Sequence, residues 1–173
     1  MNNIILTNVL RFIGLCLLQV LVFKQMSPGW ENFNYISVIA YPIFLMLLPL
    51  RTPHMLLVFL GFVLGLCVDI FYNSPGVHAS ASVFTAFIRP FVLGLLEPRG
   101  GYNLNHSPTK RRFGITWFAL YASILLGAHL FFYFSVEAFT FYYIGQILLR
   151  TIASFIVSII FVIIYQVIFD PKD

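Results

Sequence analysis

The chain is a succession of long apolar runs separated by short polar segments. An apolar run of about 20 residues is long enough for an α-helix to cross the hydrocarbon core of a bilayer. The sequence therefore predicts an all-α integral membrane protein, with six transmembrane helices in a single domain, 1–173. The predicted spans are Ile4–Phe23, Asn34–Leu50, His54–Tyr72, Val77–Leu96, Phe113–Val136 and Tyr142–Phe169.

The second predicted span differs from the others because it contains Pro42 and ends beside Pro49. Proline is tolerated in membrane helices where neighbouring groups satisfy the freed carbonyls. We therefore predict a helix over this run as well. The Ser27-Pro28-Gly29 sequence ahead of it predicts a turn after the first span.

Composition supports the membrane prediction. Hydrophobic residues make up 60% of the chain and charged residues 9%, against about 25% charged in soluble domains. So few polar residues cannot cover a soluble fold, which excludes a soluble enzyme and a nucleic-acid-binding domain despite the net charge of +4. Cys16 and Cys67 both lie in apolar runs and are interpreted as packing residues, with no disulfide and no metal.

The connections between the spans differ in charge. On one side they hold only Lys24, and on the other side the basic residues are Arg51, Arg99, Lys110, Arg111, Arg112 and Lys172. The positive-inside rule then places both termini in the cytoplasm. The cluster Lys110-Arg111-Arg112 is either such a topology signal or a contact for anionic lipid. No basic residue precedes the first span and no small-x-small site follows it, so we expect it to be retained rather than cleaved.

Four charged residues fall inside the predicted spans: Arg11, Asp69, Arg89 and Arg150. A charge at the centre of a bilayer costs about 2.5–3.5 kcal/mol on insertion scales, so each one requires a structural or functional reason. Asp69 and Arg150 both fall in the outer half of the membrane, whereas Arg11 and Arg89 lie nearer the cytoplasmic side. Depth alone therefore predicts a contact between Asp69 and Arg150.

Small and polar residues recur at helical spacing and form stripes. In the third span Gly61, Gly65 and Asp69 share one face, in a GxxxG pattern that leads to the acid. The other stripes are Ser82, Thr85, Ala86 and Arg89; Ala119, Ser123 and Gly127; and Gln146, Arg150, Ser154 and Ser158. Such stripes either hold the helices together or face a cavity or a partner.

No catalytic pattern is found in the sequence. The motifs HExxH, GxSxG and GxxxxGK[ST] are absent, and His54, His78, His106 and His129 lack the i, i+4 spacing of metal ligands. Asp69, His78 and Ser80 are the residue types of a hydrolytic triad, but such a set is easily found by chance. We therefore predict a protein that is not an enzyme and uses no cofactor.

The third span and the turn after it resemble the MreD family of rod shape-determining membrane proteins. That family has a glycine-rich helix, an acid and a short turn before a G-[LV]-H-A-like helix start. Here the pattern runs from Gly61 through Gly65 to Asp69, and continues as Asn73-Ser74-Pro75-Gly76-Val77-His78-Ala79. Pro75 directly precedes Gly76, where the family more often has an intervening residue.

The resemblance implies a bacterial cytoplasmic-membrane protein of the cell-elongation machinery, with no catalytic activity. Its partners would be an MreC-like protein and, through it, MreB, RodA and a class B penicillin-binding transpeptidase, in addition to membrane lipids and without nucleic acid. The architecture is also similar to the substrate-binding subunits of energy-coupling-factor vitamin transporters, which gives the alternative function. The candidate structural or partner-binding residues are Gly61, Gly65, Asp69, Pro75, Gly76, His78, Arg89, Gln146 and Arg150.

Overall fold

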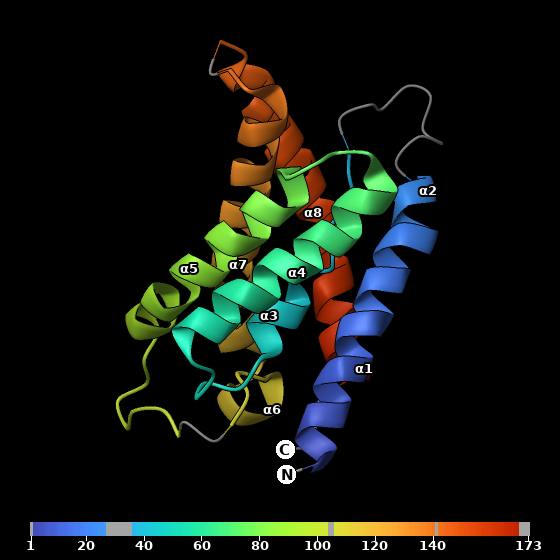
Figure 1. Ribbon diagram of the computed structural model, residues 1–173. Coiled ribbons are helices and arrows are strands. Elements are labelled where there is room, and N and C mark those ends of the chain that lie inside the picture. Colours follow the sequence, from blue (N-terminus) through green and yellow to red (C-terminus); the bar gives the residue numbers. More distant parts are fainter. Residues whose placement is uncertain (1, 27–35, 104–105, 141, 170–173) are drawn as a thin grey trace.

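The computed structural model describes residues 2–26, 36–103, 106–140 and 142–169, and this part of the chain is helical without any strand (Figure 1). The elements are α1 (Asn2–Leu18), a π-helical turn η1 (Gln19–Phe23), α2 (Lys24–Met26), α3 (Ile43–Leu47), α4 (His54–Tyr72), α5 (Val77–Leu95), α6 (Lys110–Phe113), α7 (Ile115–Ala138) and α8 (Ile144–Ile168). The turn predicted at Ser27-Pro28-Gly29 and the basic Lys172 lie outside the described residues.

Among the described residues, five helical stretches are long and apolar enough to cross a membrane: Ile5–Phe23, His54–Tyr72, Val77–Leu95, Ile115–Ala138 and Ile144–Ile168. They correspond to five of the six predicted spans, with bounds that differ by at most two residues. The prediction of an all-α membrane protein is confirmed at this level.

The prediction of a continuous helix over the second span, Asn34–Leu50, is wrong. Residues 36–40 have no regular structure, and α3 that follows has only five residues. Pro42 takes the position before α3, and Pro49 favours an extended conformation at Leu48, which has φ −60° and ψ 146°. All five residues of α3 are buried, so the irregular backbone is enclosed by protein, the condition under which such backbone occurs at membrane depth.

The helices pack in sequence order around this buried segment. The largest helix contact is between α4 and α5; α7 packs on α5, and α8 packs on α7. In Figure 1, α1 flanks the bundle on the side of α4, with α3 behind α4. The start of α1 and the end of α8 lie at the same end of the bundle, at the bottom of Figure 1.

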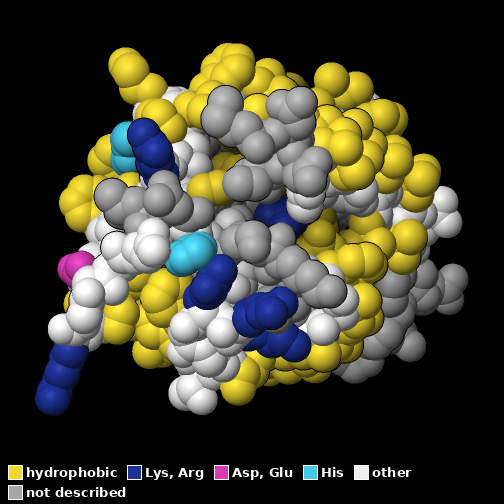
Figure 2. Space-filling view, turned by 90° about the horizontal axis from the view of Figure 1, so that it is seen from below, with side chains coloured by type: hydrophobic (Ala, Val, Ile, Leu, Met, Phe, Trp, Pro, Cys, Tyr) yellow, Lys and Arg dark blue, Asp and Glu magenta, His cyan; other side chains and the backbone are white. Residues whose placement is uncertain are grey.

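That lower end carries the basic connections. Figure 2 views it from below, and Lys and Arg side chains gather across its surface. Arg51, Arg99, Arg111 and Arg112 are exposed there. The connection before α6 is tied to the bundle by Tyr102, whose hydroxyl donates to the Leu93 carbonyl at 2.8 Å.

Candidate functional site

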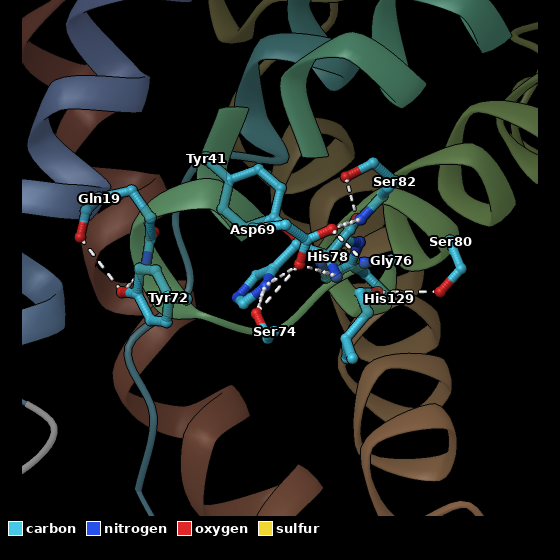
Figure 3. A network of polar contacts seen from close by, with 12 residues as sticks. Gln19, Tyr41, Asp69, Tyr72, Ser74, Gly76, His78, Ser80, Ser82 and His129 are labelled. Carbon is cyan, nitrogen blue, oxygen red and sulfur yellow. Dashed lines mark hydrogen bonds and ion pairs between the residues drawn. The ribbon is translucent and has the colours of Figure 1, made fainter. Parts of the chain in front are cut away.

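Asp69 organises the turn between α4 and α5. It is 3% exposed and stands in the last turn of α4. Its Oδ1 accepts hydrogen bonds from the Ser74 hydroxyl at 3.0 Å and from the His78 backbone N–H at 2.9 Å. Its Oδ2 accepts from the backbone N–H groups of Gly76 and Ala79, both at 3.0 Å. A single carboxylate thus satisfies backbone donors across the whole turn (Figure 3).

This arrangement is a helix N-cap supplied from the preceding helix. The first N–H groups of a helix have no partner within it, and the residue at the cap position normally accepts from them through its side chain. Gly76 takes that position in α5, with φ 87°, and has no side chain to do so. Asp69 takes over the role, and its negative charge lies at the positive end of the α5 dipole.

His78 is the second member of the site and is fully buried. Its Nδ1 lies 2.9 Å from Asp69 Oδ1, so the imidazole donates to the carboxylate. The rings of Tyr72, Tyr133 and Tyr41 surround it, with centroids 4.7, 4.8 and 5.8 Å from the imidazole centroid. The Asp69–His78 pair is therefore held in an aromatic enclosure at the top of the bundle.

The geometry does not match a hydrolytic triad. A triad places the acid on one imidazole nitrogen and the nucleophilic hydroxyl on the other. Here Asp69 and the Ser74 hydroxyl both lie at Nδ1 of His78, at 2.9 and 3.0 Å. Ser80 instead donates to the Val77 carbonyl at 2.9 Å. Within the described chain Nε2 of His78 has no hydrogen-bond partner.

Gly61 and Gly65 allow α4 and α5 to approach closely. A Cβ on Gly65 would lie 2.3 Å from the Ala79 Cα, and a Cβ on Gly61 would lie 2.9 Å from the Ser82 carbonyl oxygen. Both contacts are with backbone or its Cα, which cannot move without separating the helices. The GxxxG stripe is thus used inside the protein, and it brings Asp69 within reach of the start of α5.

A second buried cluster lies deeper in the bundle. The Tyr41 hydroxyl is 3.0 Å from His129 Nε2, and the Thr85 hydroxyl is 2.8 Å from His129 Nδ1. Thr85 donates its own proton to the Ala81 carbonyl at 2.8 Å, so its oxygen accepts from His129. These bonds fit a neutral imidazole that accepts from Tyr41 and donates to Thr85.

The residues that replace the predicted second helix, 36–53, are called the broken segment here, and polar side chains satisfy the backbone of its first part, 36–40. Gln19 donates to the Val38 carbonyl at 2.9 Å and accepts from the Ala40 N–H at 3.0 Å, as a neighbouring strand would. On the opposite side, Ser154 and Ser158 of α8 accept from the N–H groups of Ser37 and Ile39, both at 2.9 Å. The predicted polar stripe of the last span therefore faces inward at these two serines.

Three other side chains bind the carbonyls at the end of α3. Tyr121 donates to the Met46 carbonyl at 3.0 Å, Arg11 to the Leu47 carbonyl at 3.5 Å, and Arg89 to the Leu48 carbonyl. Arg89 also donates to the Tyr121 hydroxyl at 3.0 Å. Positive charge at a helix C-terminus is favourable. Arg11 and Arg89, two of the arginines within the predicted spans, therefore bind backbone carbonyls of the broken segment.

The predicted contact between Asp69 and Arg150 is wrong. Arg150 pairs with Glu137 at 2.8 Å and lies over the Phe134 ring, 4.6 Å from its centroid. Gln146, from the same predicted stripe, is exposed. Asp69 instead accepts hydrogen bonds from His78 and from the turn.

The remaining predicted residues lie at the two ends of the bundle. Pro75 and Gly76 are exposed at the turn between α4 and α5. They line a hollow of about 440 Å³ together with Leu66, Asp69, Ile70 and Asn73. Lys110, Arg111 and Arg112 form α6 at the opposite end.

Several site residues were not predicted from the sequence: Gln19, Tyr41, Ser74, Tyr121 and Glu137. A lone glutamine within an apolar run was a usable signal for Gln19, since a buried amide requires partners. Tyrosines are too common in this chain to single out two of them.

Comparisons of this chain with known protein families, with curated proteins and with solved structures find no match.

Proposed function

We propose that this chain is a non-catalytic membrane scaffold of the bacterial cell-elongation complex, which helps to organise peptidoglycan synthesis and to regulate cell shape. The Asp69 turn carries the proposal. Gly65, Asp69, Gly76 and His78, which carry the resemblance to the MreD family, belong to one unit in which the carboxylate caps α5. Because these residues contact one another in a single turn, their match to the family pattern is more specific than a match of unconnected residues would be.

The proposal includes an orientation in the bacterial inner membrane. The five long helices and the broken segment 36–53 make six crossings in it, with both termini and the basic end of Figure 2 in the cytoplasm. The Asp69 turn then faces the outer side of the membrane, where peptidoglycan is assembled.

The exposed rim of that turn is the surface that we assign to the partner. Ile70 is 73% exposed and Phe71 50% exposed, beside the hollow lined by Asn73, Pro75 and Gly76. The rim thus combines apolar side chains with a rigid turn. We propose that an MreC-like protein binds here and connects the chain to MreB, RodA and a class B penicillin-binding transpeptidase.

The scaffold is favoured over an enzyme by how the acid is used. Hydrogen bonds from Ser74, Gly76, His78 and Ala79 occupy both carboxylate oxygens of Asp69, and the imidazole beside it is surrounded by tyrosine rings. These bonds give the carboxylate a structural role as the cap of α5.

A transporter subunit that binds a small molecule is the alternative. Its site would require room near Asp69 at the outer end of the bundle. The hollow of about 440 Å³ beside Asp69 lies at the exposed turn, whereas Tyr41, Tyr72 and Tyr133 surround His78 within the bundle, which favours the scaffold.

Purification of the tagged chain from native membranes of its host separates these functions. The proposal predicts recovery of an MreC-like protein together with wall-synthesis enzymes. Recovery of an energising membrane subunit and ATPases without any wall-synthesis protein would contradict it and support the transporter.

A further inference from the structure

A long groove runs between α1 and α8. Its lower part has a volume of about 490 Å³ and is lined by Thr7, Leu10, Arg11, Gly14, Leu15, Leu18, Tyr165 and Phe169. A second hollow of about 220 Å³ shares Leu15, Leu18, Tyr165 and Phe169, and adds Val22, Ala40 and Ile43. The two hollows form one groove along α1.

The groove lies below the contact between Phe23 of η1 and Phe161 of α8, whose ring centroids are 4.9 Å apart. Gly14 has no side chain to project from α1 into the groove. A Cβ built on it would meet nothing within 4 Å. Ala40 and Ile43 of the broken segment lie against the upper part.

Arg11 gives this apolar groove a positive charge. Only 8% of its surface is exposed. It donates to Asn8 Oδ1 at 3.1 Å and to the Leu47 carbonyl at 3.5 Å, and it forms no ion pair with any described residue. A guanidinium has five N–H donors, so these two bonds and the contact of Arg11 with the Tyr165 hydroxyl still leave donors over. An anion in the groove would compensate the charge.

The level of Arg11 fits a lipid headgroup. Helical side chains lean toward the N-terminus of their helix, and the bond to Asn8 shows that Arg11 reaches toward the basic end. Lys110 of α6 lies beside the last turn of α8, where its Nζ is 3.4 Å from the Val167 carbonyl. Basic groups at this level attract anionic lipids.

We propose that this groove binds an anionic phospholipid from the leaflet at the basic end of the bundle. Its phosphate pairs with Arg11, and one acyl chain follows α1 and η1 from Arg11 to Val22. That path is about 16 Å long at the helical rise per residue, or about half of the hydrocarbon thickness, which is the share of one leaflet.

The dimensions favour an acyl chain over a helix from a partner protein. A helix with its side chains is about 10–12 Å across, too wide to enter a groove whose upper part holds about 220 Å³. It would rest on the rim and leave Arg11 without an anion. An acyl chain fills the groove, and its headgroup compensates the charge.

The experiment reconstitutes the full chain in vesicles of equal parts phosphatidylglycerol and phosphatidylcholine, followed by mild extraction and native mass spectrometry. We expect the protein to retain phosphatidylglycerol over phosphatidylcholine about fivefold, the selectivity that one basic group gives near anionic headgroups. Arg11→Gln should remove this preference. Arg99→Gln, which changes an exposed arginine at the same end, should keep it.

A second pair of variants tests the acyl path. Gly14→Leu fills the groove and should reduce total retained lipid, whereas Gly94→Leu adds the same side chain on α5, also into open space, and should not. If Arg11→Gln does not fold, the lipid retention of Gly14→Leu tests the proposal by itself. Equal retention of both lipids, unchanged binding by Gly14→Leu, displacement of the lipid by inorganic phosphate alone, or a partner's helix found in the groove would each overturn the proposal.

Discussion

The carboxylate of Asp69 binds His78 twice, at the backbone N–H and at the imidazole Nδ1, each over 2.9 Å. Asp69 belongs to the last turn of α4 and His78 to the first turn of α5. The pair therefore fixes the angle at which two membrane helices meet, and it ties the buried imidazole to the exposed turn. Loss of the charge should affect the whole end of the bundle that carries this turn.

Asp69→Asn should destabilise the protein by on the order of 3 kcal/mol, because the amide turns a donor toward backbone N–H groups that then lack an acceptor. Glu137→Gln is the matched control: it neutralises an acid whose ion pair with Arg150 is about one third exposed, and it should cost less than about 1 kcal/mol. Unfolding in mixed detergent micelles, followed by circular dichroism, measures both. Equal losses would show that the turn does not depend on the carboxylate.

Gly65→Ala should weaken the α4–α5 contact by about 1–3 kcal/mol, since the new Cβ would lie 2.3 Å from the Ala79 Cα and the helices must separate. Gly14→Ala adds the same methyl group to α1 in open space and should be neutral or slightly stabilising. The same unfolding measurement compares them. If Gly65→Ala is as stable as Gly14→Ala, the close approach of the helices is not required.

Gln19→Leu should expose the broken segment to exchange, because the Ala40 N–H loses its acceptor and the Val38 carbonyl its donor. Hydrogen–deuterium exchange of the peptide containing Ala40 should become at least tenfold faster, the factor that about 1.4 kcal/mol of lost protection gives. Gln146→Leu changes an exposed glutamine on α8 and should leave this peptide as protected as before. Unchanged protection of this peptide in Gln19→Leu would show that Gln19 does not stabilise the broken segment.

Tyr121→Phe should cost about 1–3 kcal/mol, because the Met46 carbonyl and the Arg89 Nε are left unpaired within the bundle. Tyr142→Phe removes a hydroxyl from a side chain that is 85% exposed and should change stability by less than about 0.5 kcal/mol. Thermal unfolding in detergent provides the comparison. A difference of less than 0.5 kcal/mol between the two variants would mean that the end of α3 is held by other groups.

The sequence predicted the helices α4, α5, α7 and α8 well because each is a long apolar run ended by glycine, proline or polar residues. It predicted the importance of Asp69 because a lone acid in such a run requires a reason. The prediction of a helix over 34–50 was wrong because the hydropathy of a segment indicates its burial and not its backbone conformation. Pro42 and Pro49 together left room for little more than one helical turn, which was the signal against a helix.

The predicted Asp69–Arg150 contact failed for a geometric reason. Sequence spacing gives the depth of a residue in the membrane, but not its position around the bundle axis. Glu137, the true partner of Arg150, was missed because the predicted fifth span ended at Val136. Arg11 and Arg89 bind backbone carbonyls of the broken segment. Backbone carbonyls are present at every residue, so the sequence does not indicate which of them are free to accept.

The most direct test of the proposed function is cell shape. In a rod-shaped host depleted of this chain, cells should become round or wide, and expression of the wild-type chain or of Glu137→Gln should restore rods. Asp69→Asn, brought to the same amount in the membrane, should restore them poorly or not at all. Cells that stay rod-shaped without the chain, or that Asp69→Asn restores as fully as the wild type, would contradict a shape-determining scaffold organised by the Asp69 turn.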